Sequence, residues 1–226
     1  MNICEHLTIP ASLFPEAEAI VFEGRRYSYA ELDSLSVQAA DVLRQAGVVP
    51  GDRVAIMLPN VPSFAVWYYA ALRIGGVALS ISTRSVGDEV AFVVADSGAR
   101  ALVADASALA AVSGALEFSD IATLEVSEVG EHCNGEPLPK SQSLKSTWVD
   151  AQPHDPALIL YTSGTTGLPK GATLSHANVR SNLHAFNHLC GMQGTDRILL
   201  AMPLFHCLGQ NALLNSEMNV GATLVL

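Results

Sequence analysis

The residues from Tyr161 to Gly171 have the types and spacing to bind phosphate. This stretch, YTSGTTGLPKG, combines hydroxyl side chains, glycines and one lysine. Glycines let backbone N–H groups turn toward an anion without a Cβ clash, hydroxyls donate hydrogen bonds, and an ammonium group adds positive charge. The candidate nucleotide-binding residues are Thr162, Ser163, Gly164, Thr165, Thr166, Gly167 and Lys170.

Two widespread phosphate-binding motifs do not fit this stretch. The loop GxxxxGK[ST] of nucleoside triphosphatases needs a glycine before its lysine and a hydroxyl after it. Counted from Gly164, Pro169 precedes Lys170 and Gly171 follows it. The dinucleotide fingerprint GxGxxG has no match here either. The non-functional alternative is a surface loop rich in turn residues.

Other residues with reactive or metal-binding side chains give weaker signals. His184 and His188 have the four-residue spacing of a metal pair on a helix, but no third ligand is evident, so we predict a solvated helix face and no metal site. Cys207 adjoins His206, yet sequence neighbours need not face each other. The aromatic run Trp67–Tyr69 is predicted to serve packing.

Composition limits the class of protein. The chain has 226 residues, half of them hydrophobic, and 22 acidic against 12 basic residues give a net charge of −10. Such a charge disfavours non-specific binding to nucleic acid. The four cysteines lack the short spacing of zinc or redox motifs, and the N-terminus lacks the basic start of a secretory signal. The most apolar run, Phe64–Leu72, is shorter than the ~20 residues that span a bilayer. The sequence predicts a soluble, cytoplasmic protein.

The elements that must position these residues alternate between strand and helix, with short glycine-rich joints. This rhythm predicts an α/β fold of layered, mostly parallel β-sheets flanked by helices. The segment Glu131–Pro153 breaks the rhythm and is predicted to be a surface connection. We expect strands within 19–29, 52–58, 77–82, 99–105, 157–162, 171–174, 197–202 and 222–226. We expect helices at 29–46, 62–76, 85–98, from Ser175 onward, and at 208–218. Ser28 with Glu31, Ser85 and Ser175 are the expected caps of three of these helices.

The stretch YTSGTTGLPKG resembles the signature of the AMP-forming adenylating superfamily, which includes acyl- and aryl-CoA synthetases. PLFHCLG, from Pro203 to Gly209, resembles a second element common in acyl-CoA synthetases. The resemblance implies that the loop binds the β- and γ-phosphates of ATP while a carboxylate attacks the α-phosphate, and that coenzyme A then takes the acyl group. Thr162, Ser163, Thr165 and Thr166 would donate to phosphate, Gly164 and Gly167 would let the loop close, Lys170 would be catalytic beside the leaving pyrophosphate, and His206 would contact the acid. A buried core histidine is the alternative for His206.

The resemblance also implies how the chain is organised. Residues 1–226 would be the N-terminal part of an AMP-binding domain, inactive alone, with most Mg²⁺ ligands outside this chain. Residues 53–194 would form a first α/β sheet unit; 1–52 and 195–226 would be the remnant of a second, with Ala222–Leu226 left without strand partners and prone to self-association. The element PLFH favours fatty or aryl acids. The alternative is a non-catalytic module, from a truncated gene, that binds a nucleotide or a partner.

Overall fold

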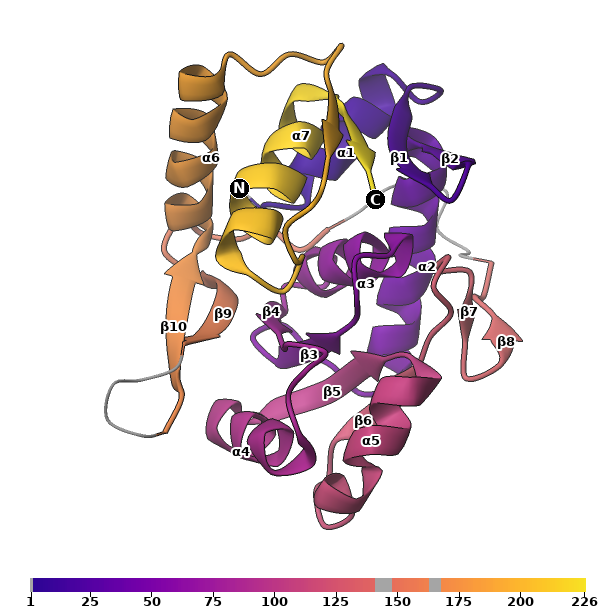
Figure 1. Ribbon diagram of the computed structural model, residues 1–226, viewed down its shortest axis with the longest axis vertical. Coiled ribbons are helices and arrows are strands. Elements are labelled where there is room, and N and C mark those ends of the chain that lie inside the picture. The colour runs from indigo at the N-terminus through magenta and orange to yellow at the C-terminus, as the bar shows by residue number, and fades with distance from the viewer. Residues whose placement is uncertain (1, 141–147, 163–167) are drawn as a thin grey trace.

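Two larger β-sheets with flanking helices, and one small two-stranded sheet, make up the part of the chain that the structure describes (Figure 1). A computed structural model describes residues 2–140, 148–162 and 168–226. One sheet has six strands in the order β10-β9-β4-β3-β5-β6, and the other has four in the order β11-β12-β1-β2. Most pairs are parallel; β9 with β10 and β1 with β2 are antiparallel. The predicted α/β class is confirmed.

The six-stranded sheet is covered by helices on both faces. Its successive strand residues alternate between two clusters, as the pleat of a strand requires. Val54 and Ile56 pack in the cluster that contains α2 and α3, whereas Ala55 and Met57 pack in the cluster that contains α4 and α5. The bounds are β3 Arg53–Met57, β4 Val77–Ser80, β5 Ala99–Ala104, β6 Ala122–Glu125, β9 Pro156–Thr162, β10 Lys170–Ser175, α2 Tyr29–Gln45, α3 Pro62–Arg73, α4 Gly87–Ser97 and α5 Ala106–Leu116.

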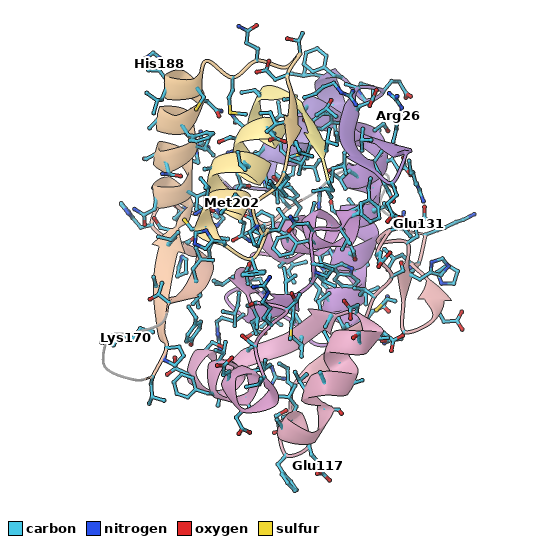
Figure 2. The ribbon with its side chains drawn as sticks, viewed as in Figure 1. Arg26, Glu117, Glu131, Lys170, His188 and Met202 are labelled. Atoms are coloured by element: carbon cyan, nitrogen blue, oxygen red, sulfur yellow. The ribbon has the colours of Figure 1, made fainter. Side chains whose placement is uncertain are left out.

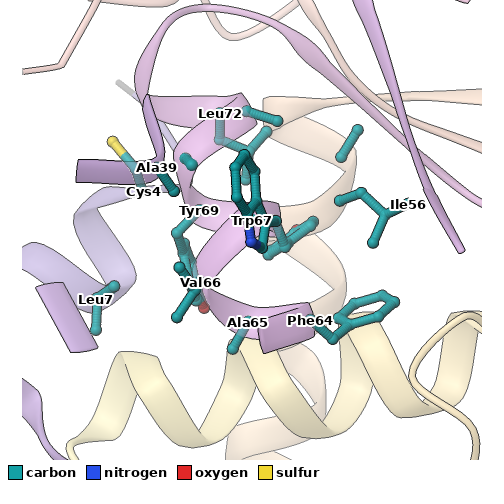
Figure 3. Packing of buried hydrophobic residues seen from close by; sticks show 14 of the residues in the cluster. Cys4, Leu7, Ala39, Ile56, Phe64, Ala65, Val66, Trp67, Tyr69 and Leu72 are labelled. Atoms are coloured by element: carbon teal, nitrogen blue, oxygen red, sulfur yellow. The ribbon is translucent and has the colours of Figure 1, made fainter. Parts of the chain in front are cut away.

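Helix α3 is the centre of the larger core. Every one of its residues is buried, including Trp67, Tyr68 and Tyr69, so the prediction that these aromatics serve packing is confirmed. Pro62 stands in the first turn, where its missing N–H costs no helical hydrogen bond. Figure 3 shows Trp67 and Tyr69 projecting from this helix among Ile56, Leu72 and other apolar side chains.

The four-stranded sheet joins both ends of the chain. It consists of β1 Glu18–Phe22, β2 Arg25–Ser28, β11 Arg197–Leu199 and β12 Thr223–Val225. The predicted hairpin at Glu23-Gly24 is confirmed, with φ of 48° and 82°. The prediction that Ala222–Leu226 lacks partners is wrong: β12 pairs in parallel with β1 on one side and with β11 on the other. The assignment of the sheets to separate units stays a prediction.

Two of the three serines that were predicted to cap helices do so. Ser28 accepts a hydrogen bond from the Glu31 N–H, and Ser175 from the Asn178 N–H at the start of α6 (His176–Cys190), as predicted. The prediction for Ser85 is wrong, because α4 begins at Gly87 with Val86 at the N-cap.

Several elements were not predicted. They are α1 Glu5–Leu13, helix α5, strand β6 and the short hairpin of β7 His132–Cys133 and β8 Glu136–Pro137 within the predicted surface connection. The predicted helix at 208–218 is a π-helix, Leu208–Leu214, followed by α7, Asn215–Val220. Within the described ranges, no helix combines the length and apolarity that a membrane crossing requires.

Candidate functional site

Two strands carry the flanks of the predicted phosphate loop. Thr162 ends β9, Lys170 begins β10, and the two residues are cross-strand partners. Both are exposed, and Figure 2 shows Lys170 at the margin of the molecule. β10 is an edge strand, so the flanks stand at one side of the six-stranded sheet. The remaining predicted residues, Ser163, Gly164, Thr165, Thr166 and Gly167, lie outside the described residues.

A pocket of about 370 Å³ brings the two sequence elements together. Thr162 and Pro169 from the loop flanks line it, as does His206, which lies far along the chain. Lys170 is not in the lining but sits opposite Thr162. The other lining residues are Ser80, Ile81, Ser82, Ser85, Glu89, Val93, Leu160, Tyr161, Phe205 and Cys207.

His206 is exposed at this pocket, so the alternative of a buried core histidine is wrong. Its Nδ1 accepts a hydrogen bond from the backbone N–H of Leu208 at 3.2 Å. A ring nitrogen that accepts carries no proton, so the neutral imidazole holds its proton on Nε2. That Nε2–H is a donor suited to a carboxylate oxygen.

The segment that carries His206 is fixed by Asn60, a residue that the sequence analysis missed. The side chain of Asn60, in the loop after β3, donates to the carbonyl of Met202 at 2.9 Å and accepts from the N–H of Leu204 at 2.8 Å. The donor and the acceptor of its amide group both bind the same backbone segment, so Asn60 holds residues 202–204 against the end of β3. A lone asparagine after a strand gives no signal of this role.

Gly209 sets the turn that follows. A Cβ at this position would lie 2.2 Å from the carbonyl oxygen of Pro203, far inside van der Waals contact. Only glycine therefore allows the π-helix to begin so close to the segment that holds His206. Nearby, Gln210 donates to the Ser80 hydroxyl at 2.9 Å and ties the π-helix to the end of β4.

The described lining of the pocket contains no lysine or arginine side chain to supply positive charge. Within the described lining, the one carboxyl side chain belongs to Glu89. None of the ion pairs between described residues involves Lys170. An unpaired ammonium beside a pocket edged with hydroxyls can receive a polyphosphate, because its charge is not already compensated.

No metal centre is formed by the part of the chain that the structure describes: no group of three or more His, Cys, Asp or Glu side chains converges. His184 and His188 are both exposed on α6.

Comparison with known proteins identifies relatives of the whole chain. The sequence profile of the family described as AMP-binding enzyme matches residues 8–226. The long-chain-fatty-acid–CoA ligase FadD13 of Mycobacterium tuberculosis is 32% identical over 226 residues, which cover 99% of this chain and 44% of the relative. The 4-coumarate–CoA ligase 5 of Oryza sativa is 31% identical, covering 90% of this chain and 38% of the relative. ATP-bound MatB from Rhodopseudomonas palustris superposes with a TM-score of 0.84 at 28% identity, covering all of this chain and 45% of that one.

The chain thus spans less than half the length of these relatives.

Proposed function

Because the chain belongs to the family of AMP-binding enzymes, we propose that it is the N-terminal part of an ATP-dependent acid–CoA ligase. The complete enzyme activates a carboxylic acid as an acyl-adenylate, releases pyrophosphate, and transfers the acyl group to coenzyme A. The observation that carries this proposal is the shared pocket: Thr162, from the loop flank, and His206, from the second family element, line one cavity.

Each site residue has a role in the proposed reaction. The Thr162 hydroxyl donates to phosphate, and the Lys170 ammonium, on the facing strand, stabilises the charge that grows on the leaving pyrophosphate. Ser163, Gly164, Thr165, Thr166 and Gly167 complete the phosphate contacts. The Nε2–H of His206 donates to the carboxylate of the acid.

The proposed cofactors follow from this chemistry. ATP is a substrate, Mg²⁺ arrives on its phosphates, and coenzyme A is the acceptor. Mg²⁺ takes one or two protein carboxylates and keeps its remaining positions for phosphate and water. Among the described lining residues Glu89 supplies one carboxylate, so further ligands of Mg²⁺ are expected elsewhere in the complete enzyme.

The acid is proposed to be a fatty or aryl acid. Support comes from the element PLFH and from the names of the relatives, one of which acts on long-chain fatty acids and another on 4-coumarate. Aliphatic and aromatic side chains of the pocket, among them Ile81, Leu160 and Phe205, suit an apolar acyl group. The net charge of −10 supports small-molecule partners over nucleic acid, and a cytoplasmic location is proposed.

Self-association through a sheet edge also stays a prediction. The prediction placed this edge at Ala222–Leu226, but β12 is paired on both sides; the edge strands of its sheet are β2 and β11, Arg197–Leu199, whose Leu199 side chain is exposed. Light scattering on the purified chain tests it.

The test of the proposed reaction compares Lys170→Ala with Lys140→Ala in the complete enzyme. ATP–pyrophosphate exchange is measured with a panel of fatty, aryl and amino acids. We expect exchange with a fatty or aryl acid, and kcat/KM for ATP lowered at least about 100-fold in Lys170→Ala, because an interaction made to the developing charge is lost. Lys140 is exposed and does not line the pocket, so Lys140→Ala retains wild-type rates. Exchange that is absent with every acid, or equal rates in the two variants, contradicts the proposal.

A further inference from the structure

The flanks of the phosphate loop project beyond the sheet that carries them. β4 pairs with β9 from Leu158 to Leu160 and no further. The pairing of β9 with β10 continues past that point, to Tyr161 with Gly171 and Thr162 with Lys170. Those four residues form a two-stranded projection with no third strand beside it among the described residues. A ribbon of two strands is a weakly stabilised structure in water, so a side-chain tie to the body of the protein matters here.

Tyr161 supplies such a tie. Its hydroxyl donates a hydrogen bond to the Oδ2 of Asp96, a residue on α4 far back in the sequence. Hydrogen bonds to carboxylate acceptors are stronger than those to neutral ones. Burial, and then the contact with Asp96, raises the pKa of the Tyr161 phenol above its ordinary value, so the hydroxyl remains a donor at physiological pH.

Gly171 makes room for this arrangement. A Cβ at Gly171 would lie 3.1 Å from two ring carbons of Tyr161 and 3.0 Å from a methyl carbon of Ile159. The Tyr161 ring therefore lies against the bare backbone of its cross-strand partner, a pairing in which an aromatic ring covers an edge glycine. The ring is confined between Gly171 on one side and the hydrogen bond to Asp96 at its tip.

Asp96 stands where a carboxylate is locally unfavourable. It lies in the last turn of α4, which carries no basic residue, and the carbonyl end of a helix repels negative charge. A residue that breaks a local rule points to a use elsewhere in the molecule. The contact with Tyr161 is that use, because Tyr161 also lines the pocket shared by Thr162 and His206.

We propose that Asp96 is a positioning residue for nucleotide binding: by holding Tyr161, it fixes the projecting end of the β9–β10 pair and so the places of Thr162 and Lys170 at the pocket. This inference rests on the proposed function. Asp96 is not among the residues that line the pocket, and it acts through Tyr161.

The test measures steady-state kinetics of the complete enzyme carrying Tyr161→Phe, Asp96→Ala or Asp96→Asn. Tyr161→Phe and Asp96→Ala should each lower kcat/KM for ATP about tenfold, since small misplacements of binding groups are costly, while KM for the acid stays within about twofold. Asp96→Asn should recover most of the loss, because an amide oxygen still accepts from the hydroxyl. The double variant Tyr161→Phe/Asp96→Ala should be no worse than either single one. Tyr27→Phe is the control, since the hydroxyl of Tyr27 has no hydrogen-bond partner among the described residues.

Hydrogen exchange on the 226-residue chain gives a readout without catalysis. The amide proton that faces β9, that of either Lys170 or Gly171, should exchange faster in Tyr161→Phe than in the wild type, while those of β4 stay unchanged. Equal effects on the kinetics of ATP and of the acid, additive losses in the double variant, or unchanged exchange at the amide that faces β9 would each overturn the inference. A large effect of Lys170→Ala combined with wild-type kinetics in Tyr161→Phe would reject the role of Asp96 and leave the proposed function standing. No effect in any of these variants would reject both.

Discussion

The guanidinium group of Arg73 is paired with the carboxylate of Asp33 where α3 packs on α2. The side chain of Arg73 is 1% exposed, and its Nη2 also donates to the hydroxyl of Ser36 at 2.9 Å. The charge stands at the C-terminal end of α3, where the helix dipole favours a cation. This buried pair connects the helix at the centre of the core to the helix beside it.

Removal of one partner of that pair should be costly. Asp33→Ala leaves a buried guanidinium group without its carboxylate and should lower the free energy of unfolding by about 3–5 kcal/mol. Urea unfolding followed by circular dichroism measures the change. Ser34→Ala, on the exposed side of the same helix, should change it by less than about 0.5 kcal/mol. Replacing both charges, in Asp33→Leu/Arg73→Met, should restore most of the loss; a double variant as unstable as Asp33→Ala would show that the charges themselves are needed.

The carboxyl group of Glu217 should make stability depend on pH. Glu217 is 0% exposed, neither of its side-chain oxygens has a hydrogen-bond partner among the described residues, and burial raises its pKa from 4.5 to about 9. The folded protein therefore keeps a proton that the unfolded chain releases above pH 4.5. The contribution of this carboxyl group to the free energy of unfolding is fully present below pH 4.5. It is lost as the pH rises toward 9, by at most about 1.4 kcal/mol per pH unit.

Glu217→Gln tests this dependence because an amide stays neutral at every pH. The variant should lose less stability than the wild type between pH 5 and 8 in urea titrations. Glu117→Gln, at an exposed position after α5 (Figure 2), should follow the wild type. Parallel pH profiles of wild type and Glu217→Gln would contradict the prediction.

Gly209→Ala should disturb the segment that carries His206. The new methyl group would overlap the carbonyl oxygen of Pro203, so the backbone must move, at a cost of about 1–3 kcal/mol or more. Thermal unfolding should show a lower midpoint. Gly114→Ala is the matched control with the opposite sign: it lies inside α5 with nothing within 4 Å of its Cβ, and alanine there should stabilise the helix by about 0.5–1 kcal/mol. A Gly209→Ala variant as stable as the wild type would mean that the 203–209 turn relaxes freely.

The 226-residue chain alone should not form an acyl-adenylate. Positioning is worth about 7–11 kcal/mol of a reaction barrier, and the chain spans 44% of a relative that is a complete ligase. Pyrophosphate release with ATP and the acid panel is the assay. Turnover within tenfold of the complete enzyme would show that this chain contains all the catalytic groups.

Local sequence signals predicted the parts of the fold that depend on local physics. The hairpin at Glu23-Gly24, the caps at Ser28 and Ser175 and the buried helix after Pro62 each follow from a few neighbouring residues. Ser85 failed as a cap because the hydrogen-bonding capacity of a serine does not fix where a helix starts; α4 begins later, at Gly87. Helix α5 was missed because its run of small residues, Ala106 to Leu116, shows little amphipathic contrast.

The site was predictable as a list of residue types and not as an arrangement. Thr162 and His206 could be proposed one by one, whereas their shared pocket depends on how two sheets pack. Asn60 and Asp96 gave no signal, and Tyr161 stood in the signature without any sign of its tie to Asp96, because each acts through contact with a distant segment. The partners of Ala222–Leu226 were predicted wrongly for the same reason: strand pairing between the two ends of a chain leaves no local trace.

That pairing has a consequence for how the protein reaches its fold during synthesis. Strand β1 leaves the ribosome early, yet Ile20 finds its partner Leu224 only after β12 has emerged. Until then the N-terminal hairpin has both edges unpaired, that of β1 as well as that of β2, a hazard for association with other chains. The six-stranded sheet, whose strands run from Arg53 to Ser175, can close before that moment. Folding is thus expected to begin in the six-stranded sheet, with β1 and β12 paired later, and a delay in synthesis between Ser175 and β12 would prolong the aggregation-prone stage.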